Sequence, residues 1–144
     1  EGLLTGKINR QQSGEAGTRQ GDGWAEPYIK DKALFYNLID TLQEIAVQHR
    51  VSVAQVTPAW LRERPNVDSL VLAARTKEQL QDNIASYNLE LTSQETAAIT
   101  DLTIPEPIYP LWHRAMNSYD KASESEKVYL DGYNQLMSNK DTLL

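Results

Sequence analysis

The feature that most constrains the fold is a short apolar segment at residues 69 to 73, Ser-Leu-Val-Leu-Ala, in which polar and apolar residues do not alternate. Such a run is typical of a strand buried on both faces of a parallel sheet. One other segment, residues 2 to 5, reads as the end of an apolar strand that runs into a turn. Two strands cannot bury both faces of a sheet and also satisfy its edges. Further strands are therefore expected from elsewhere, and the lack of an initiator Met favours the same expectation of a fragment.

Helices are expected over most of the remaining chain. Residues 31 to 49 carry the clearest pattern, because apolar residues recur there at helical spacing and form one face: Leu34, Phe35, Leu38, Ile39, Leu42, Ile45 and Ala46. Asp31 lies near the start of this segment, where a carboxylate interacts favourably with the helix dipole.

Three capping boxes predict three more helix starts. Their members are Ser52 with Gln55, Thr76 with Gln79, and Thr92 with Glu95. In the first of these helices Pro58 is expected to cause a kink or a restart, because an internal proline removes a hydrogen bond. The second helix, from residue 77 to about residue 87, is expected to bury Leu80, Ile84 and Tyr87.

Other segments are less regular. Residues 8 to 30 are polar and glycine-rich and predict a long loop. Prolines from residue 105 to residue 110 predict an extended segment that ends at Trp112, and apolar spacing predicts a last helix over residues 124 to 137.

Composition excludes several classes of function. The net charge is −6, and the 14 Lys and Arg residues are scattered among 20 acidic ones, which argues against a nucleic-acid partner. The absence of cysteine excludes a disulfide framework and a thiolate metal site and fits a cytoplasmic location. Since no apolar run approaches the roughly 18 residues that cross a bilayer, no membrane association is expected.

The segment from residue 70 to residue 83 carries the most chemical information. A strand end that feeds a capped helix is a ready anion site, because the first N–H groups of the helix lack partners. Arg75 precedes those groups and is able to pair bidentately with a phosphate. Gln79 and Asn83 lie one helical turn apart on the face of Thr76 and together would line a nucleotide pocket. The alternative is an exposed loop arginine, a capping glutamine and a solvated asparagine.

Four segments in order resemble the aldo-keto reductase superfamily. The Ala-Arg-Thr turn with Gln79 and Asn83 is similar to its cofactor-binding segment, and Gly-Leu-Leu-Thr-Gly-Lys at residues 2 to 7 is similar to the segment after its seventh strand. Residues 52 to 61 and the Leu-Thr-x-x-Glu sequence that ends at Glu95 resemble two of its helices. Ala73 stands where many relatives have Gly, and Pro58 replaces a usual alanine.

The resemblance implies an α/β fold, a (β/α)8 TIM barrel with its active site at the C-terminal ends of the strands. This chain would be the C-terminal portion, mostly helical, with residues 1–112 in the barrel and residues 113–144 as a helical extension. The cofactor implied is NADP(H). Arg75 would hold the adenosine 2′-phosphate within the turn Ala74 to Thr76, and Gln79 and Asn83 would flank the adenine. Along the pyrophosphate the resemblance places Leu4, Gly6 and Lys7.

The catalytic Tyr, Lys, Asp and His of the family belong to its N-terminal half, so the resemblance assigns no catalytic residue here. Tyr28, Tyr87 and Tyr109 are not assigned this role, because proton donation needs a Lys–Asp pair at defined geometry, and His49 and His113 are expected to be structural or solvated. In the family the C-terminal segment closes over the substrate, so Trp112 is a candidate for the substrate pocket. Packing on the outside of the barrel is the alternative for this side chain.

Three functions remain open. The first is an NADP(H)-dependent reductase of small aldehydes or ketones that is active only with the missing N-terminal half of the barrel. The second is a non-catalytic, aldo-keto-reductase-like protein that binds a nucleotide for regulation. The third is a helical interaction fragment without a ligand.

Overall fold

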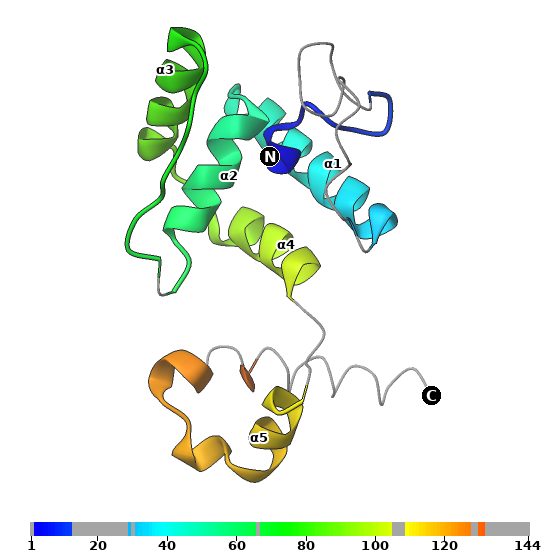
Figure 1. Cartoon of the computed structure of the whole chain (residues 1–144), viewed down its shortest axis with the longest axis vertical. Helices are drawn as coiled ribbons and strands as arrows, with labels where there is room; N and C mark the ends of the chain where they lie inside the picture. The colour runs from blue at the N-terminus through cyan, green and yellow to red at the C-terminus, as the bar shows by residue number, and fades with distance from the viewer. Residues whose placement is uncertain are drawn as a thin grey trace. The chain divides into compact units, whose positions relative to one another are not determined.

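A computed structural model describes residues 2–12, 29, 31–65, 67–104, 109–127 and 130–131. The chain divides into two compact units, Glu1–Thr103 and Ile104–Leu144, which are traced in Figure 1. In the described residues both units are built from helices and turns, and no strand occurs among them. The fold seen is thus mostly helical, as expected for this chain, while the two expected strands are absent from the described part.

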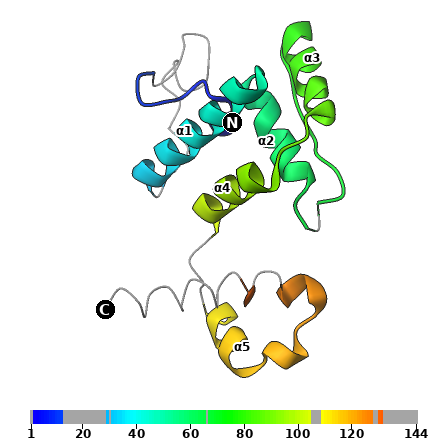
Figure 2. The same ribbon diagram turned by 180° about the vertical axis from the view of Figure 1, so that it is seen from behind.

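The first unit is organised around α1 (Lys32–His49), α2 (Val53–Arg62) and α4 (Ser93–Thr103). In both ribbon views α1 lies beside α2 and α4 (Figures 1 and 2). The start of α1 is set locally, because the Asp31 carboxylate accepts a hydrogen bond from the Leu34 N–H at 2.9 Å. The helix ends at Arg50, whose φ of 58° lies in the left-handed region. The helix expected at residues 31 to 49 is confirmed.

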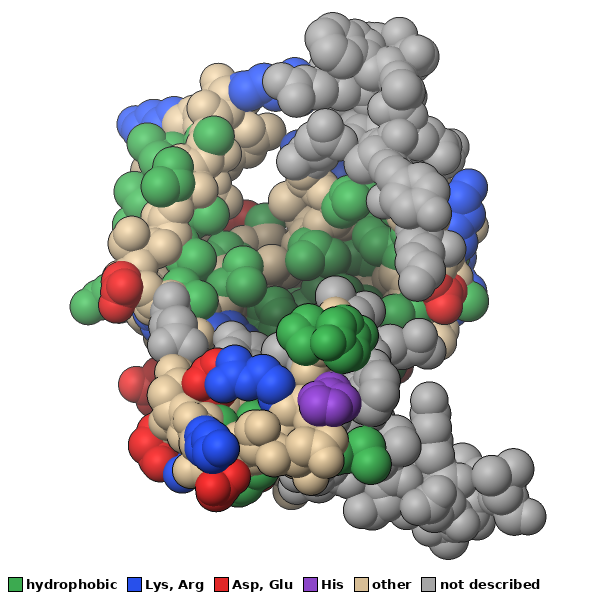
Figure 3. Space-filling view, turned by 60° about the horizontal axis from the view of Figure 1, so that its bottom comes forward, with side chains coloured by type: hydrophobic (Ala, Val, Ile, Leu, Met, Phe, Trp, Pro, Cys, Tyr) green, Lys and Arg blue, Asp and Glu red, His purple; other side chains and the backbone are tan. Residues whose placement is uncertain are grey.

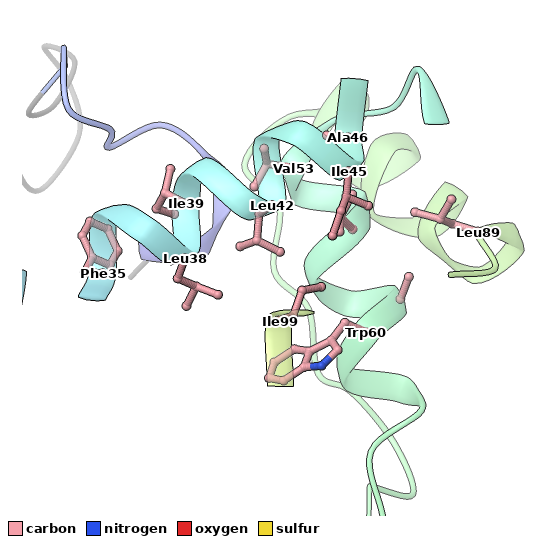
Figure 4. Close-up of a cluster of buried hydrophobic side chains, with 12 residues drawn as sticks. Phe35, Leu38, Ile39, Leu42, Ile45, Ala46, Val53, Trp60, Leu89 and Ile99 are labelled. Carbon is pink, nitrogen blue, oxygen red and sulfur yellow. The ribbon is translucent and has the colours of Figure 1, made fainter. Parts of the chain in front are cut away.

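The core of this unit lies among the same three helices (Figure 4). Burial of apolar surface drives this packing. One polar bond crosses the core edge, where the Trp60 Nε1–H donates to the Thr100 hydroxyl at 3.2 Å. The buried side chains are Phe35, Leu38, Ile39, Leu42, Ile45, Ala46, Val53, Val56, Ala59, Trp60, Leu89 and Ile99.

The second helix, α2, runs through its internal proline. Pro58 is buried and lies inside one continuous helix, so the expected restart there is wrong. Pro58 and its neighbours from Val56 to Trp60 are all buried. Packing of these residues against the rest of the unit outweighs the single hydrogen bond that the proline removes, since tertiary context overrides helix propensity.

Neither expected strand forms in the described structure. Residues 67 to 74 carry no secondary structure, and Leu3–Thr5 form the short 3-10 helix η1. Val71 is 99% exposed, although its segment reads as buried on both faces. The physical reason is that no partner strand is present among the described residues, so the segment's N–H and C=O groups face water instead of a ladder.

The third helix, α3 (Lys77–Ala85), is followed by the 3-10 turn η2 (Ser86–Asn88). The expectation that this helix buries Leu80, Ile84 and Tyr87 is wrong, because they are 49%, 62% and 76% exposed. Figure 3 shows hydrophobic side chains gathered on the visible face of the first unit. The helix contacts α2 and η2, and its apolar face would need a further element to cover it.

The second unit contains α5 (Leu111–Asn117) and the 3-10 turn η3 (Tyr119–Lys121). Its described part is held by an ion pair of 2.6 Å between Arg114 and Glu126 and by a 2.6 Å hydrogen bond from the Tyr119 hydroxyl to Asp131. Ala115, Ala122 and Leu130 form a small buried cluster.

Several expectations fall partly outside the described residues. The last expected helix is confirmed at residues 124–127 and 130–131, and the rest of residues 124 to 137 lie outside the description. The same holds for residues 105–108 and for most of the loop expected at residues 8 to 30. Trp112 lies on α5, not in an extended segment, and its side chain is also outside the description. The division expected after residue 112 stays a prediction.

Candidate functional site

The turn that leads into α3 brings together most of the expected nucleotide-binding residues. The Thr76 hydroxyl caps the helix by accepting a hydrogen bond from the Gln79 N–H at 3.2 Å. In return the Gln79 side-chain oxygen accepts a hydrogen bond from the Arg75 N–H at 2.9 Å. One turn further on, the Asn83 amide donates to the carbonyl of Ala73 at 3.4 Å. Two amide side chains of the helix therefore hold the turn that precedes it.

This turn is an open surface. All of residues 73 to 78 are exposed, whereas Gln79 and Asn83 are half-buried behind them. The cationic side chains of Arg75 and Lys77 lie at or beside the N-terminus of α3, where an anion also interacts favourably with the helix dipole. The arrangement is suited to hold a phosphate group at the molecular surface.

Glu78, which is not one of the motif residues described above for the segment at residues 73 to 83, opposes the binding of a phosphate. A hydrogen bond from its own backbone N–H, and a second from the Thr76 hydroxyl, hold the pKa of Glu78 below its usual range. The carboxylate is therefore ionised at neutral pH and occupies donors in the first turn of α3. A phosphate that binds here would have to displace or tolerate this charge. The signal was available in the sequence, since an acid at the second helical position commonly serves the helix dipole.

The second expected group, Leu4, Gly6 and Lys7, lies in and after η1. The Leu4 carbonyl accepts a hydrogen bond from the Thr57 hydroxyl of α2 at 2.7 Å. Gly6 has a φ of +78°, and a Cβ added there would lie 3.1 Å from Val53. Both facts require glycine, because other residues rarely adopt this φ and the side chain would crowd the helix. Lys7 is exposed.

Both groups are anchored on the first half of α2. The link to η1 runs through Thr57 and Val53, as described above. On the other side, Asp82 of α3 accepts hydrogen bonds from the Ser52 hydroxyl, at 2.6 Å, and from the Gln55 side-chain amide. Gln55 therefore does not complete the expected reciprocal capping box, although Ser52 still caps its N–H at 3.2 Å. Asp82 was missed in the sequence because its partners lie 27 and 30 residues away.

A groove with a volume of about 440 Å³ separates α3 from α2 and the segment at residues 67 to 72. Its polar lining residues include Asn83 and Arg62, and the Arg62 guanidinium lies 5.5 Å from the centre of the Tyr87 ring. Most of the remaining lining is apolar: Pro58, Val67, Leu70, Leu72, Ile84 and Tyr87.

Other titratable groups serve contacts within each unit. His49 at the end of α1 pairs with Glu95 at the start of α4, with 2.8 Å between Nε2 and Oε1. Within the described residues, no group of three or more His, Cys, Asp or Glu side chains is placed to hold a metal ion. In the same part of the chain, no helix has the length and hydrophobicity needed to cross a membrane.

Comparison with known proteins gives the family context of this geometry. Residues 1–104 match the model of the aldo/keto reductase family. The match confirms the resemblance inferred from four segments of the sequence.

Individual relatives cover different parts of the chain. It is 31% identical over 116 residues to L-glyceraldehyde 3-phosphate reductase of Escherichia coli O157:H7, which covers 78% of this chain and 33% of the relative. It is 30% identical over 80 residues to versiconal hemiacetal acetate reductase of Aspergillus parasiticus, covering 56% of this chain and 22% of the relative. It is 22% identical over 102 residues to NADH-specific methylglyoxal reductase of Escherichia coli K12, covering 71% and 30%. The chain thus spans between about a fifth and a third of the length of these relatives.

Proposed function

Because the chain belongs to the aldo/keto reductase family, we propose that it is the C-terminal, cofactor-binding part of a cytoplasmic, NADP(H)-dependent reductase of small aldehydes or ketones. The observation that carries the proposal is the braced, exposed turn at Arg75 in front of α3. In this proposal the chain supplies the last part of a (β/α)8 barrel, with residues 1–112 in the barrel and residues 113–144 as an extension. The N-terminal half would supply the partner strands that residues 69 to 73 lack.

The residues of the turn suit an adenosine 2′-phosphate. The guanidinium of Arg75 presents a planar fork of donors that matches phosphate oxygens. Ala74 and Thr76, both exposed, flank it in the chain, and the half-buried Gln79 and Asn83 would flank the adenine. Glu78 sets a limit on affinity, because its carboxylate repels the phosphate.

The η1 segment would lie along the pyrophosphate. Gly6 allows the segment to pack closely on Val53 of α2, and its φ of +78° is a conformation that other residues rarely adopt. Lys7 adds an exposed positive charge, and Leu4 is held against α2 by its carbonyl. Anchorage of both segments on α2 would hold the two ends of an extended nucleotide at a constant separation.

The chemistry of the reaction is divided between the cofactor and the protein. NADPH supplies the hydride when bound, and the protein binds and orients the reactants. The part of that work assigned to this chain is recognition of the adenosine end, with Trp112 as a candidate wall of the substrate pocket. The family's proton-donating Tyr and its Lys, Asp and His partners would come from the N-terminal half.

The names of the relatives support the substrate class and leave the cofactor to be tested. L-Glyceraldehyde 3-phosphate and methylglyoxal, named for two of the relatives, are small carbonyl compounds. One of these relatives is named as NADH-specific. Preference for NADPH in the present protein therefore rests on Arg75.

Nucleotide affinity of the full-length protein tests the proposal. Arg75→Ala is expected to weaken NADPH binding by about 1.5–3 kcal/mol, the value of a hydrogen bond to a charged group, and to change NADH binding little. Glu78→Gln is expected to strengthen NADPH binding about twofold, because an exposed repulsive charge is removed. Arg10→Ala is the matched control, since it removes a positive charge from an ion pair with Asp40 on α1.

Equal losses of NADPH and NADH in Arg75→Ala would contradict the assignment of the 2′-phosphate. Binding of NADPH without reduction of any small aldehyde or ketone would instead favour a regulatory, non-catalytic protein.

A further inference from the structure

The side chain of Gln79 makes a hydrogen bond within the protein. Its oxygen accepts the Arg75 N–H at 2.9 Å, and the backbone N–H of Gln79 donates to the Thr76 hydroxyl at 3.2 Å. The bond from Arg75 spans the junction between an irregular segment and a helix. It therefore ties the backbone of the arginine to a residue whose position is fixed by the helix.

We propose that Gln79 is a positioning residue for the phosphate site: it holds the backbone of Arg75 so that the guanidinium is directed at the 2′-phosphate. This inference rests on the proposed function of Arg75 and adds to the adenine contact expected for Gln79. Only the oxygen of the amide is used by the brace, so its NH2 group remains able to meet a base.

The position of the brace makes it consequential. Residues 67 to 74 carry no secondary structure in the described chain, and strand partners supplied to residues 69 to 73 would end before Arg75. The Gln79 oxygen is therefore the group that fixes the Arg75 N–H, through a hydrogen bond that is itself exposed. Without the brace, Arg75 would have to be ordered at the moment of binding, which lowers affinity.

The side-chain amide of Asn83 also holds the turn that contains Arg75. Asn83 donates to the Ala73 carbonyl at 3.4 Å, a longer and weaker contact on the other side of the turn. Asp82 fixes the helix that bears both amides to α2 through Ser52 and Gln55. The position of Arg75 is thus connected to the core of the unit through α3.

The inference predicts a loss that depends on the phosphate. If Gln79 only contacted the base, its removal would weaken every adenine nucleotide equally. If it positions Arg75, removal weakens ligands that carry the 2′-phosphate more than those that lack it. Adenosine 2′,5′-bisphosphate and adenosine 5′-monophosphate are the matched probes, because they differ in that group alone.

The test measures binding of both probes to the full-length protein by calorimetry. Gln79→Ala is expected to weaken the bisphosphate by about fivefold more than the monophosphate, the size of one net hydrogen bond. Gln81→Ala, an exposed glutamine on the same helix, is the matched control and is expected to leave the ratio of the two affinities unchanged. In an Arg75→Ala background, Gln79→Ala is expected to change that ratio by less than about twofold, since residues that act as one unit are not additive.

Amide hydrogen exchange gives a readout independent of ligand. The Arg75 N–H is expected to exchange faster in Gln79→Ala than in the unsubstituted protein or in Gln81→Ala, while core amides of α1 stay protected. Faster exchange throughout the unit would mean loss of folding, and in that case Gln79→Glu, which keeps an acceptor oxygen, is expected to restore slow exchange at Arg75.

The outcomes separate this inference from the proposed function. An equal loss for both probes in Gln79→Ala, with Arg75→Ala still selective for the bisphosphate, overturns the positioning role alone. Unchanged binding of both probes in Arg75→Ala overturns the phosphate assignment and the positioning role with it. Unaltered exchange at Arg75 in Gln79→Ala overturns the brace directly.

Discussion

Arg62→Ala is expected to lower the free energy of unfolding by about 2 kcal/mol, because one side chain closes the end of α3. The Arg62 guanidinium donates to the carbonyls of Tyr87, at 2.5 Å, Leu89, at 3.1 Å, and Ser86, at 3.3 Å. These carbonyls follow the last turn of α3, where backbone acceptors have no partner within the helix. Arg62 therefore holds the segment between α3 and α4 against α2.

The magnitude follows from which carbonyls depend on the arginine. Ser86 also accepts the Leu89 N–H at 3.2 Å, so its carbonyl keeps a partner when the side chain is removed. The other two bonds are worth about 1 kcal/mol each, below the usual range for charged donors because the Arg62 side chain is 34% exposed. Stacking over the exposed Tyr87 ring adds at most about 0.5 kcal/mol.

Urea denaturation of the full-length protein measures the effect as a shift in midpoint at constant slope. Arg62→Lys is expected to lose about half as much, because an ammonium group cannot span separate carbonyls as a planar fork does. Arg10→Ala is the matched control, because Arg10 likewise contacts an aromatic ring, that of Tyr36, and donates hydrogen bonds to Asp40 and Asn37. These hydrogen bonds are exposed and the ion pair is about half exposed on both sides, so the expected contribution is about 0–1 kcal/mol.

Equal midpoints for Arg62→Ala and Arg10→Ala would refute the reasoning, because they would show that water replaces the guanidinium at all three carbonyls. A loss of stability in Arg62→Lys as large as in Arg62→Ala would contradict the expected half loss. The planar geometry of the guanidinium, and not its charge, would then account for the whole contribution of Arg62 to stability.

Two further predictions concern the ends of α1 and α4. Arg50→Gly is expected to raise the free energy of unfolding by about 0.5–1 kcal/mol, because Arg50 has a left-handed φ of 58° that glycine adopts without strain; a lower melting temperature would contradict this. Partial burial raises the pKa of Glu95, but hydrogen bonds from the Thr92 N–H and hydroxyl and from His49 outweigh it, so the net pKa is below the ordinary 4.5. A carboxylate whose pKa is lower in the folded state stabilises the fold at pH values above its unfolded-state pKa. This stabilisation is lost as the pH falls through the folded-state pKa. The stability difference between the unsubstituted protein and Glu95→Gln is therefore expected to shrink as the pH falls from about 5 to about 3, and a difference that stays constant over that range in urea titrations would count against it.

Local patterns in the sequence were sufficient for the helices of the first unit. Asp31, Thr76 and Thr92 cap helices through bonds that span three residues, so both partners are visible in a short stretch of sequence. The apolar face of α1 was equally readable, because helical periodicity alone determines which residues share a face. The family could be recognised for a similar reason, since its motifs are short and contiguous.

The structure decided whatever depended on a distant partner. The segment at residues 69 to 73 and the apolar face of α3 were expected to be buried, and both are exposed in the described part of the chain. A side chain is buried only when another part of the protein covers it, and the sequence of a segment does not show whether such a covering element is present. Pro58 shows the opposite case, since packing around it preserves a helix that local propensity alone would interrupt.

At the candidate site the same division holds. The sequence alone placed Gln79 and Asn83 one turn apart on one face of α3, with Arg75 just before the helix, because helical geometry fixes their spacing. The three-dimensional structure was needed to show that Gln79 bonds the Arg75 backbone, four residues away, although this contact is local. It was also needed to show that Gln55 bonds Asp82 and that η1 and α3 both contact α2, and these contacts join distant parts of the chain. Hydrogen-bonding side chains have several partners within reach, and the choice among them is made by the position of elements that lie far apart in the chain.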